Sequence, residues 1–228
     1  MSIADRLASV RADIDEACRA AGRDPAEVRL LPVSKYHGVD QIREAHSAGY
    51  ALFGENKVQE MAAKHADLAA EGIGFAVIGH VQTNKARQVA EYGTELHSLD
   101  SLRLAEVLNR RLVDLERRLP VLVQVNTSGE ATKSGIEPAD AVAFARALAP
   151  FEALEPRGLM TMALNSADLD GVAQCFELLA LTRASVRDAL GGGWDELSMG
   201  MSGDFRIAIA HGATTVRLGT AVFGPRQY

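Results

Sequence analysis

Short apolar runs alternate with amphipathic segments along most of this 228-residue chain. Between residues 2 and 21, apolar side chains recur every three or four positions, which predicts an amphipathic helix. The runs that follow predict eight short strands, over residues 28–34, 50–53, 75–78, 95–98, 121–125, 158–162, 196–199 and 214–218. The segments between these strands predict helices over residues 40–48, 57–70, 84–91, 101–118, 138–148, 169–190 and 204–211.

Strands that alternate with helices in this way are typical of a parallel sheet. Eight βα units in a chain of this length predict an α/β fold, namely a closed (β/α)8 TIM barrel with the first helix as an extra N-terminal element. An open, doubly wound sheet is the alternative. Because no linker rich in proline, glycine or serine divides the chain, we expect one domain over residues 1–228. Pro32 is unusual inside the first strand, since it cannot donate a hydrogen bond to the sheet.

Composition and charge argue against several classes of binding partner and indicate where in the cell the protein works. The net charge of −6 argues against a nucleic-acid binder, which normally needs a basic face. No apolar run reaches the roughly 20 residues that cross a bilayer, and no signal-peptide pattern opens the chain. Cys18 and Cys175 form no disulfide framework, and the scattered histidines indicate no metal site. We therefore expect a cytoplasmic protein that binds neither membranes nor nucleic acid.

Polar or glycine residues follow nearly every predicted strand, where a barrel of this class places its site. Lys35 ends the first apolar run, and a buried ammonium must be paired, solvated or used chemically. Alternatively, Lys35 simply extends to water, and βα loops are polar in general. The other strand ends are Gly54-Glu55-Asn56, Gly79-His80, His97-Ser98, Asn126-Thr-Ser128, Met160-Thr-Met162, Gly200-Met-Ser202-Gly203 and Gly219-Thr220. So many polar strand ends together favour a ligand-binding mouth.

Two glycine-rich turns, after the seventh and eighth strands, predict a phosphate site. Residues 199–204 lead into a predicted helix, whose first N–H groups lack partners within the helix and attract anions. Gly219 and Thr220 would form a second loop beside it, and barrels often hold phosphate between these two loops. Arg217 points to the opposite side of its strand from its two apolar neighbours, which places its guanidinium inside the barrel. An ion pair with a carboxylate is the alternative role for Arg217.

Together these residues resemble the successive motifs of one family. The motifs are Val33-Ser-Lys35, Phe53-Gly-Glu-Asn56, Ile78-Gly-His80 with Gln82 and Asn84-Lys85, His97-Ser-Leu-Asp100, Lys133-Ser-Gly135, Gly158-Leu-Met-Thr-Met162, Leu197-Ser-Met-Gly-Met-Ser-Gly-Asp204 and Arg217-Leu-Gly-Thr220 with Phe223-Gly224. The family is that of the pyridoxal 5′-phosphate (PLP) homeostasis proteins, which are related to the N-terminal barrel of alanine racemase. The resemblance runs in order from about Leu30 to Tyr228. The combination is highly specific, although single pieces such as Gly-His are not.

The resemblance implies a fold-type III PLP-binding barrel without the C-terminal β-domain of the racemase. Lys35 would hold PLP covalently as an aldimine, and Arg217 would face the pyridine nitrogen. Ser202, Gly203, Gly219 and Thr220 would hold the phosphate, Asn56 would contact the ring, and His80, Met160 and Met199 would line the site. The chemistry of the residues agrees, because an aldehyde needs an amine that can deprotonate, and burial near an arginine favours deprotonation of a lysine.

Arg217 also bears on reactivity. An arginine accepts no proton from the ring nitrogen, so the pyridine would stay largely unprotonated and would be a weak electron sink. The racemase takes one of its bases from its C-terminal β-domain, and here the chain ends at Tyr228. We therefore expect no catalytic residues, a cofactor open to solvent on one side, and a monomer. The predicted function is PLP binding in vitamin B6 homeostasis, which buffers PLP or supplies it to apo PLP-dependent enzymes.

Two other functions stay open on the sequence. One is a PLP-dependent amino-acid racemase of low activity. The other is a barrel enzyme that uses Lys35 as a Schiff-base nucleophile on a sugar phosphate, without PLP.

Four further polar residues have simpler interpretations. His97 is expected to be a hydrogen-bonded core histidine rather than a base. Glu55 is expected to form a salt bridge with a lysine of the mouth rather than to act as a general base. Asp100 is interpreted as the cap of the helix predicted over residues 101–118, with Ser101 as the alternative cap. Lys133 could attract phosphate or help to pass the cofactor to a client enzyme, but it is more simply a solvated or loop-stabilising lysine.

Overall fold

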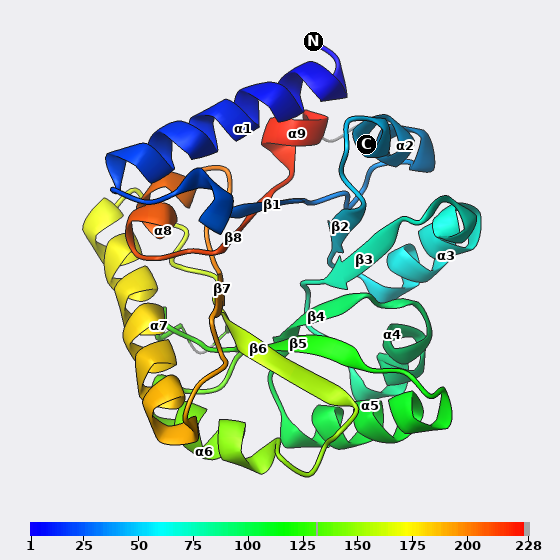
Figure 1. Ribbon diagram of the computed structural model, residues 1–228, viewed down its shortest axis with the longest axis vertical. Helices are drawn as coiled ribbons and strands as arrows, with labels where there is room; N and C mark the ends of the chain where they lie inside the picture. Colours follow the sequence, from blue (N-terminus) through cyan, green and yellow to red (C-terminus); the bar gives the residue numbers. More distant parts are fainter. Residues whose placement is uncertain (131, 226–228) are drawn as a thin grey trace.

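Eight parallel strands form a closed barrel in the computed structural model, which describes residues 1–130 and 132–225 (Figure 1). The hydrogen-bonded order is β1-β8-β7-β6-β5-β4-β3-β2. The barrel closes between β1 and β2 through one parallel bridge, Val33 with Gly54, where the Ser34 N–H donates to the Gly54 carbonyl at 3.0 Å. The strands are β1 (Arg29–Pro32), β2 (Leu52–Glu55), β3 (Gly74–Val77), β4 (Glu95–Leu99), β5 (Leu119–Gln124), β6 (Leu154–Met160), β7 (Glu196–Ser198) and β8 (Thr215–Leu218). This confirms the predicted closed barrel over the open sheet.

Helices surround the barrel, and α1 lies across α8 and α9 (Figure 1). The α-helices are α1 (Ile3–Ala20), α2 (Val39–Ser47), α3 (Val58–Leu68), α4 (Ala86–Tyr92), α5 (Leu102–Asp114), α6 (Ala141–Ala147), α7 (Leu169–Leu190), α8 (Phe205–Ala210) and α9 (Thr220–Phe223). Short 3-10 turns cover Pro25–Glu27, Ala69–Glu71, Thr83–Lys85 and Pro138–Asp140. Helix α1 starts at a capping box, in which Ser2 and Asp5 each bond the other's backbone N–H, and it buries the predicted apolar face.

The barrel wall separates two kinds of interior. Leu30 points outward into the large apolar core between strands and helices, whereas Leu31 points inward. On the β1–β3 side, the inside of the barrel is apolar and contains Leu31, Val33, Ala76 and Ile78. On the side of β4, β7 and β8, the inside contains buried polar side chains instead, among them His97, Ser198 and Arg217. A site at the mouth of this barrel therefore has one apolar wall and one polar wall.

Strand positions depart from prediction where polar residues enter a strand. The second strand was expected over residues 50–53 but covers Leu52–Glu55, and the sixth was expected over residues 158–162 but covers Leu154–Met160. Pro32 is the last residue of β1, so its missing N–H costs the sheet little. Helix α9 was not predicted. Gly158 is required where β6 passes β7, because a Cβ there would lie 1.9 Å from the Glu196 carbonyl oxygen.

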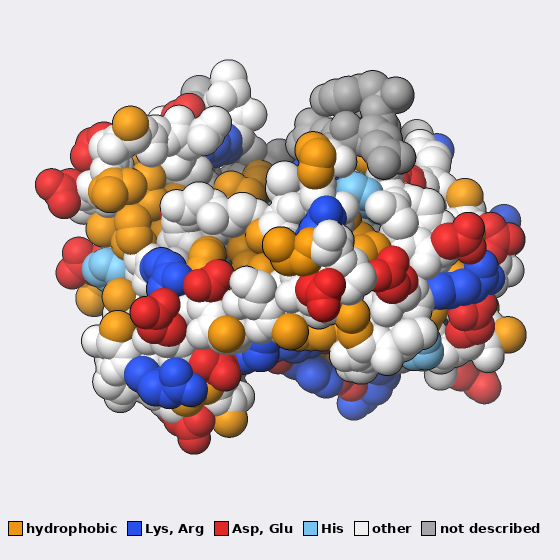
Figure 2. Space-filling model, turned by 90° about the horizontal axis from the view of Figure 1, so that it is seen from above, with side chains coloured by type: hydrophobic (Ala, Val, Ile, Leu, Met, Phe, Trp, Pro, Cys, Tyr) orange, Lys and Arg blue, Asp and Glu red, His pale blue; other side chains and the backbone are white. Residues whose placement is uncertain are grey.

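The surface carries both charge signs. Acidic and basic side chains lie next to one another over much of the face shown in Figure 2. Within the described part of the chain, no helix combines the length and the apolar character that crossing a membrane requires.

Candidate functional site

A cavity of about 280 Å³ opens at the carboxyl ends of the strands. Residues that follow six strands (β1, β2, β3, β6, β7 and β8) line it, together with Arg217 from β8 itself. The lining residues are Val33, Lys35, His37, Asn56, Ile78, Met162, Met201, Ser202, Gly203, Arg217, Gly219 and Thr220. The structure thus brings together seven of the residues singled out from the sequence: Lys35, Asn56, Ser202, Gly203, Arg217, Gly219 and Thr220.

Lys35 lies on a sharp turn just after β1. The next residue, Tyr36, adopts the left-handed conformation with φ of 67°, which is uncommon for a residue with a side chain. The Tyr36 N–H donates to Glu60 Oε1 at 2.6 Å. On the other side of Lys35, the Ser34 hydroxyl donates to Glu55 Oε1 at 2.6 Å. The backbone that carries Lys35 is therefore held from both sides by carboxylates of β2 and α3.

Lys64 of α3 joins these two carboxylates. Its ammonium donates to Glu55 Oε1 at 2.6 Å, to Glu60 Oε1 at 2.8 Å and to the Ser34 carbonyl at 2.8 Å. Lys64 is 7% exposed and Glu55 is fully buried, so the ion pair between these two residues is shielded from water. Burial raises the pKa of Glu55, although Lys64 and the Ser34 hydroxyl oppose the shift. This confirms a salt bridge for Glu55, but its partner is Lys64 of α3, which does not line the cavity, and not a lysine of the mouth as predicted.

Arg217 lies at the polar wall of the cavity. It is 4% exposed, and its Nη1 and Nη2 donate to the Ser198 hydroxyl and the Thr161 carbonyl, each at 2.7 Å. Burial lowers the pKa of Arg217 to about 10, against the opposing charge of Asp204. The guanidinium therefore stays charged at neutral pH, and within residues 1–130 and 132–225 it forms no ion pair. The inward orientation predicted for Arg217 is confirmed, and the alternative carboxylate pair is not found there.

Two loops, which follow β7 and β8, present small and hydroxylated residues to the same cavity. Ser202 and Gly203 precede α8, and Gly219 and Thr220 lie at the start of α9. Asp204 shapes the first loop, because its carboxylate accepts the Met201 N–H. No atom lies within 4 Å of the point where a Cβ of Gly203 would be, so the space beside this residue is open.

Other singled-out residues lie outside the cavity lining. Met199 has no exposed surface and packs in the outer core. Met160 is also fully buried. His80 lines a separate pocket and bonds Asp100 at 2.8 Å through Nδ1. The interpretation of Asp100 as the helix cap is wrong, since the alternative residue, Ser101, caps α5.

The remaining polar predictions agree with the structure. His97 is 1% exposed and bonded through both ring nitrogens, as expected of a core histidine. Lys133 donates to the Ala163 carbonyl at 2.9 Å and pairs with Glu130, so it stabilises its loop.

The sequence reasoning did not assign five lining residues to the site: Val33, His37, Ile78, Met162 and Met201. His37 could have been found from its place two residues after Lys35. Its ring stacks on Phe223 with centroids 4.9 Å apart. Met162 and Met201 follow predicted strands, but methionine in a core is the default interpretation.

Comparison with known proteins agrees with this architecture. Residues 6–227 match the family described as "Alanine racemase, N-terminal domain". A pyridoxal phosphate homeostasis protein of Pseudomonas aeruginosa is 45% identical over 227 residues, which cover 100% of this chain and 97% of that protein. The PipY protein of Synechococcus elongatus has been solved without PLP (TM-score 0.89, 37% identity) and with PLP bound (TM-score 0.86, 36% identity), and each match covers 98% of this chain and 100% of PipY. Similarity of this extent, over the full length of the barrel, shows that the chain belongs to the pyridoxal phosphate homeostasis protein family.

Proposed function

We propose that this protein binds PLP covalently through Lys35 and buffers or supplies it in intracellular vitamin B6 homeostasis, without turning over a substrate of its own. One observation carries the proposal: a single cavity contains an amine, a guanidinium and two hydroxyl-bearing loops around apolar side chains. PLP presents an aldehyde, a ring nitrogen, a phosphate and a flat apolar ring. Each of these features has a chemically matched group in the lining, so the residues fit the cofactor.

The covalent link needs only the Lys35 amine. The amine attacks the aldehyde carbon, a carbon–nitrogen double bond forms, and the aldehyde oxygen leaves as water after taking up the amine protons. The clamped turn at Lys35 supports this role, because an amine on an ordered backbone loses less freedom when it forms the bond. Ser202, Gly203, Gly219 and Thr220 would bind the phosphate. Val33, Ile78 and Met162 would pack against the ring.

Arg217 favours storage over catalysis. PLP supplies an electron sink when its ring nitrogen is protonated, and a guanidinium that stays charged donates hydrogen bonds but accepts none. The relatives' name, homeostasis protein, agrees with a role in PLP supply. We further propose a cytoplasmic location, since Cys18 and Cys175 are buried free thiols that suit a reducing compartment.

A transfer assay tests the proposed function. Purified protein incubated with PLP should turn yellow, and borohydride should attach the cofactor to the peptide that contains Lys35. Loaded protein should then restore activity to an apo PLP-dependent enzyme in the presence of a trap for free PLP. A protein that stays colourless after incubation with PLP would contradict the proposal.

The second candidate, a weak amino-acid racemase, has support from the family description, which refers to alanine racemase. Exchange of the α-hydrogen of alanine and other amino acids in deuterated water distinguishes the two. Under our proposal the loaded protein exchanges no faster than free PLP. Sustained exchange far above that rate, absent in a Lys35→Ala variant, would favour the racemase.

Arg217→Ala and Ser202→Ala should each weaken PLP binding without unfolding the chain. Removing a charged donor from a buried site costs roughly 10- to 100-fold in affinity, and removing one hydroxyl costs roughly 3- to 10-fold. Both affinities are measured by fluorescence titration, and folding by circular dichroism on heating. Wild-type affinity in both variants would contradict the placement of the ring and phosphate.

A further inference from the structure

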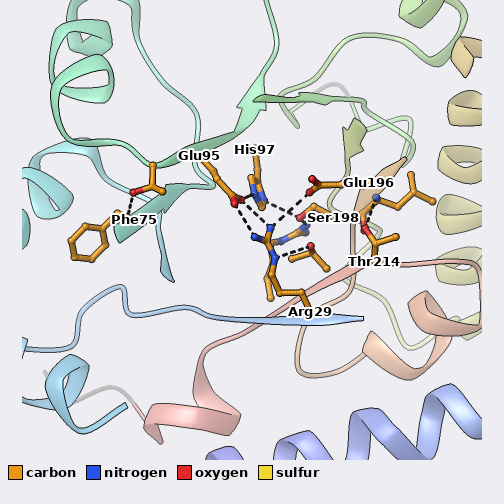
Figure 3. A network of polar contacts seen from close by, with 11 residues as sticks. Arg29, Phe75, Glu95, His97, Glu196, Ser198 and Thr214 are labelled. Atoms are coloured by element: carbon orange, nitrogen blue, oxygen red, sulfur yellow. Dashed lines mark hydrogen bonds and ion pairs between the residues drawn. The ribbon is translucent and has the colours of Figure 1, made fainter. Parts of the chain in front are cut away.

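A chain of polar contacts runs from Arg29 through Glu95, His97 and Ser198, which Figure 3 labels, and ends at Arg217. Arg29 of β1 donates two hydrogen bonds to Glu95 of β4, at 2.8 and 2.9 Å. Glu95 Oε2 lies 2.8 Å from His97 Nε2, and His97 Nδ1 lies 3.0 Å from the Ser198 hydroxyl of β7. Ser198 in turn accepts the Arg217 Nη1–H at 2.7 Å. The chain therefore crosses the barrel interior and ends at the cavity.

The hydrogen positions along this chain follow from its two charged ends. Burial acts to raise the pKa of Glu95, but hydrogen bonds from His97 and Arg29 outweigh it and lower the pKa to about 2, so Glu95 only accepts. His97 must then carry its proton on Nε2, and burial lowers its pKa, which keeps the ring neutral. Nδ1 is left as an acceptor, so the Ser198 O–H points to it.

The orientation of the Ser198 hydroxyl matters to Arg217. With its proton directed at His97, the hydroxyl oxygen presents a lone pair to the guanidinium, which has only donors. If the proton turned toward Arg217 instead, two donors would face each other. Glu95 is linked to the guanidinium only through a ring and a hydroxyl, so its charge acts by ordering these hydrogen bonds.

We infer that His97 is a positioning residue for the cofactor site: it orients the Ser198 hydroxyl, which holds the Arg217 guanidinium at the polar wall of the cavity. His97 and Ser198 do not line the cavity, so they act only through Arg217. The inference rests on the proposed function in so far as Arg217 faces PLP. The Arg29–Glu95 pair is assigned the role of setting the tautomer of His97.

Two substitutions at His97 separate positioning from mere packing. His97→Leu fills similar space but offers no acceptor, and it should weaken PLP binding roughly 3- to 10-fold. His97→Asn can place its amide oxygen near the position of Nδ1, and it should recover most of that affinity. The matched control is Leu112→Ala in α5, a fully buried core residue remote from the cavity, which should lower the melting temperature and leave PLP affinity unchanged. Wild-type affinity in His97→Leu would overturn the inference.

A double-mutant cycle tests whether the effect passes through Ser198. Ser198→Ala should weaken PLP binding about as much as His97→Leu, and the double variant should be no weaker than Ser198→Ala alone. Additive losses would mean that His97 acts by another route. If His97→Leu does not fold, Ser198→Ala alone decides, because unchanged affinity in that variant removes the link.

A measurement without PLP keeps this inference distinct from the proposed function. In the PLP-free protein, ¹⁵N spectra should show His97 as the Nε2–H tautomer. Rotation of the Arg217 guanidinium should be slow in the wild type and faster in Ser198→Ala. A protein that bound no PLP but showed these signals would overturn the proposed function and leave the positioning chain standing. An Nδ1–H tautomer would overturn the inference even if PLP bound normally.

Discussion

Lys64→Met should lower the free energy of unfolding by about 3–5 kcal/mol at pH 8, the cost typical of removing one partner from a buried ion pair. Lys64 is the cation that faces the buried Glu55 and the half-buried Glu60, and its three hydrogen bonds leave with it. Glu55 Oε2 has no hydrogen-bond partner among the described residues, so the carboxylate would keep only the Ser34 hydroxyl. Methionine has a similar length and fills the space, so the loss reports charge and hydrogen bonding.

The loss of unfolding free energy caused by Lys64→Met should be smaller at lower pH. Burial already raises the pKa of Glu55 with Lys64 beside it, and loss of the cation raises that pKa further. A carboxyl whose pKa is higher in the folded than in the unfolded state binds its proton more readily when folded, so stability falls as pH rises through the folded pKa. Urea unfolding of Lys64→Met at pH 5 and pH 8 should therefore show the larger loss at pH 8.

Two variants control this result. Lys57→Met, at an exposed lysine just before α3, should change stability by no more than about 0.5 kcal/mol. Glu55→Gln combined with Lys64→Met removes the buried charge and should recover much of the loss. If the free energy of unfolding of Lys64→Met were within about 1 kcal/mol of the wild-type value at both pH values, the cluster would not hold the Lys35 turn as described.

The barrel was predictable because its alternation of strands and helices is local in sequence. The predicted strand boundaries were wrong where a strand contains a residue that is stable there only because of a partner elsewhere in the chain. Glu55 belongs to β2 although it is acidic and fully buried, and only Lys64, on the following helix, makes that possible. In β6, the polar and proline residues before Gly158 pair with β5, which no local pattern reveals.

Many residues of the candidate site could be predicted, because the residues that follow the strands of a barrel gather at one mouth. Met199 does not line the cavity because side chains alternate between the two faces of a strand. Ser198 points inward to Arg217, so Met199 points outward into the core between strands and helices. His97 was expected to be a bonded core histidine, but its partner Ser198 lies 101 residues away. A contact that closes across a barrel has no signature in a single sequence, so the positioning chain could come only from the structure.

Lys35→Ala should convert PLP from a covalently held ligand into one that exchanges freely. Arg217, Ser202 and Thr220 still line the cavity, so we expect residual binding, weakened on the order of 100-fold, or about 2.7 kcal/mol. The yellow colour of the bound form should give way to the spectrum of the free aldehyde, and dialysis should remove the cofactor. Absorption spectra before and after dialysis, with titration of the apo protein, measure both effects.

Lys133→Ala is the matched control, because Lys133 is a second lysine on a loop after a strand but is engaged with Glu130 and the Ala163 carbonyl. That variant should retain covalent PLP at the wild-type stoichiometry after borohydride reduction, whereas Lys35→Ala should retain none. Full labelling of Lys35→Ala would place the covalent link on another lysine. The hydrogen bonds at Ser34 and Tyr36 would then hold a turn that plays no part in binding PLP. The proposed placement of the PLP ring nitrogen beside Arg217 would also be wrong. Because labelling and dialysis report the bond separately from affinity, the two variants together distinguish loss of the link from loss of the cavity.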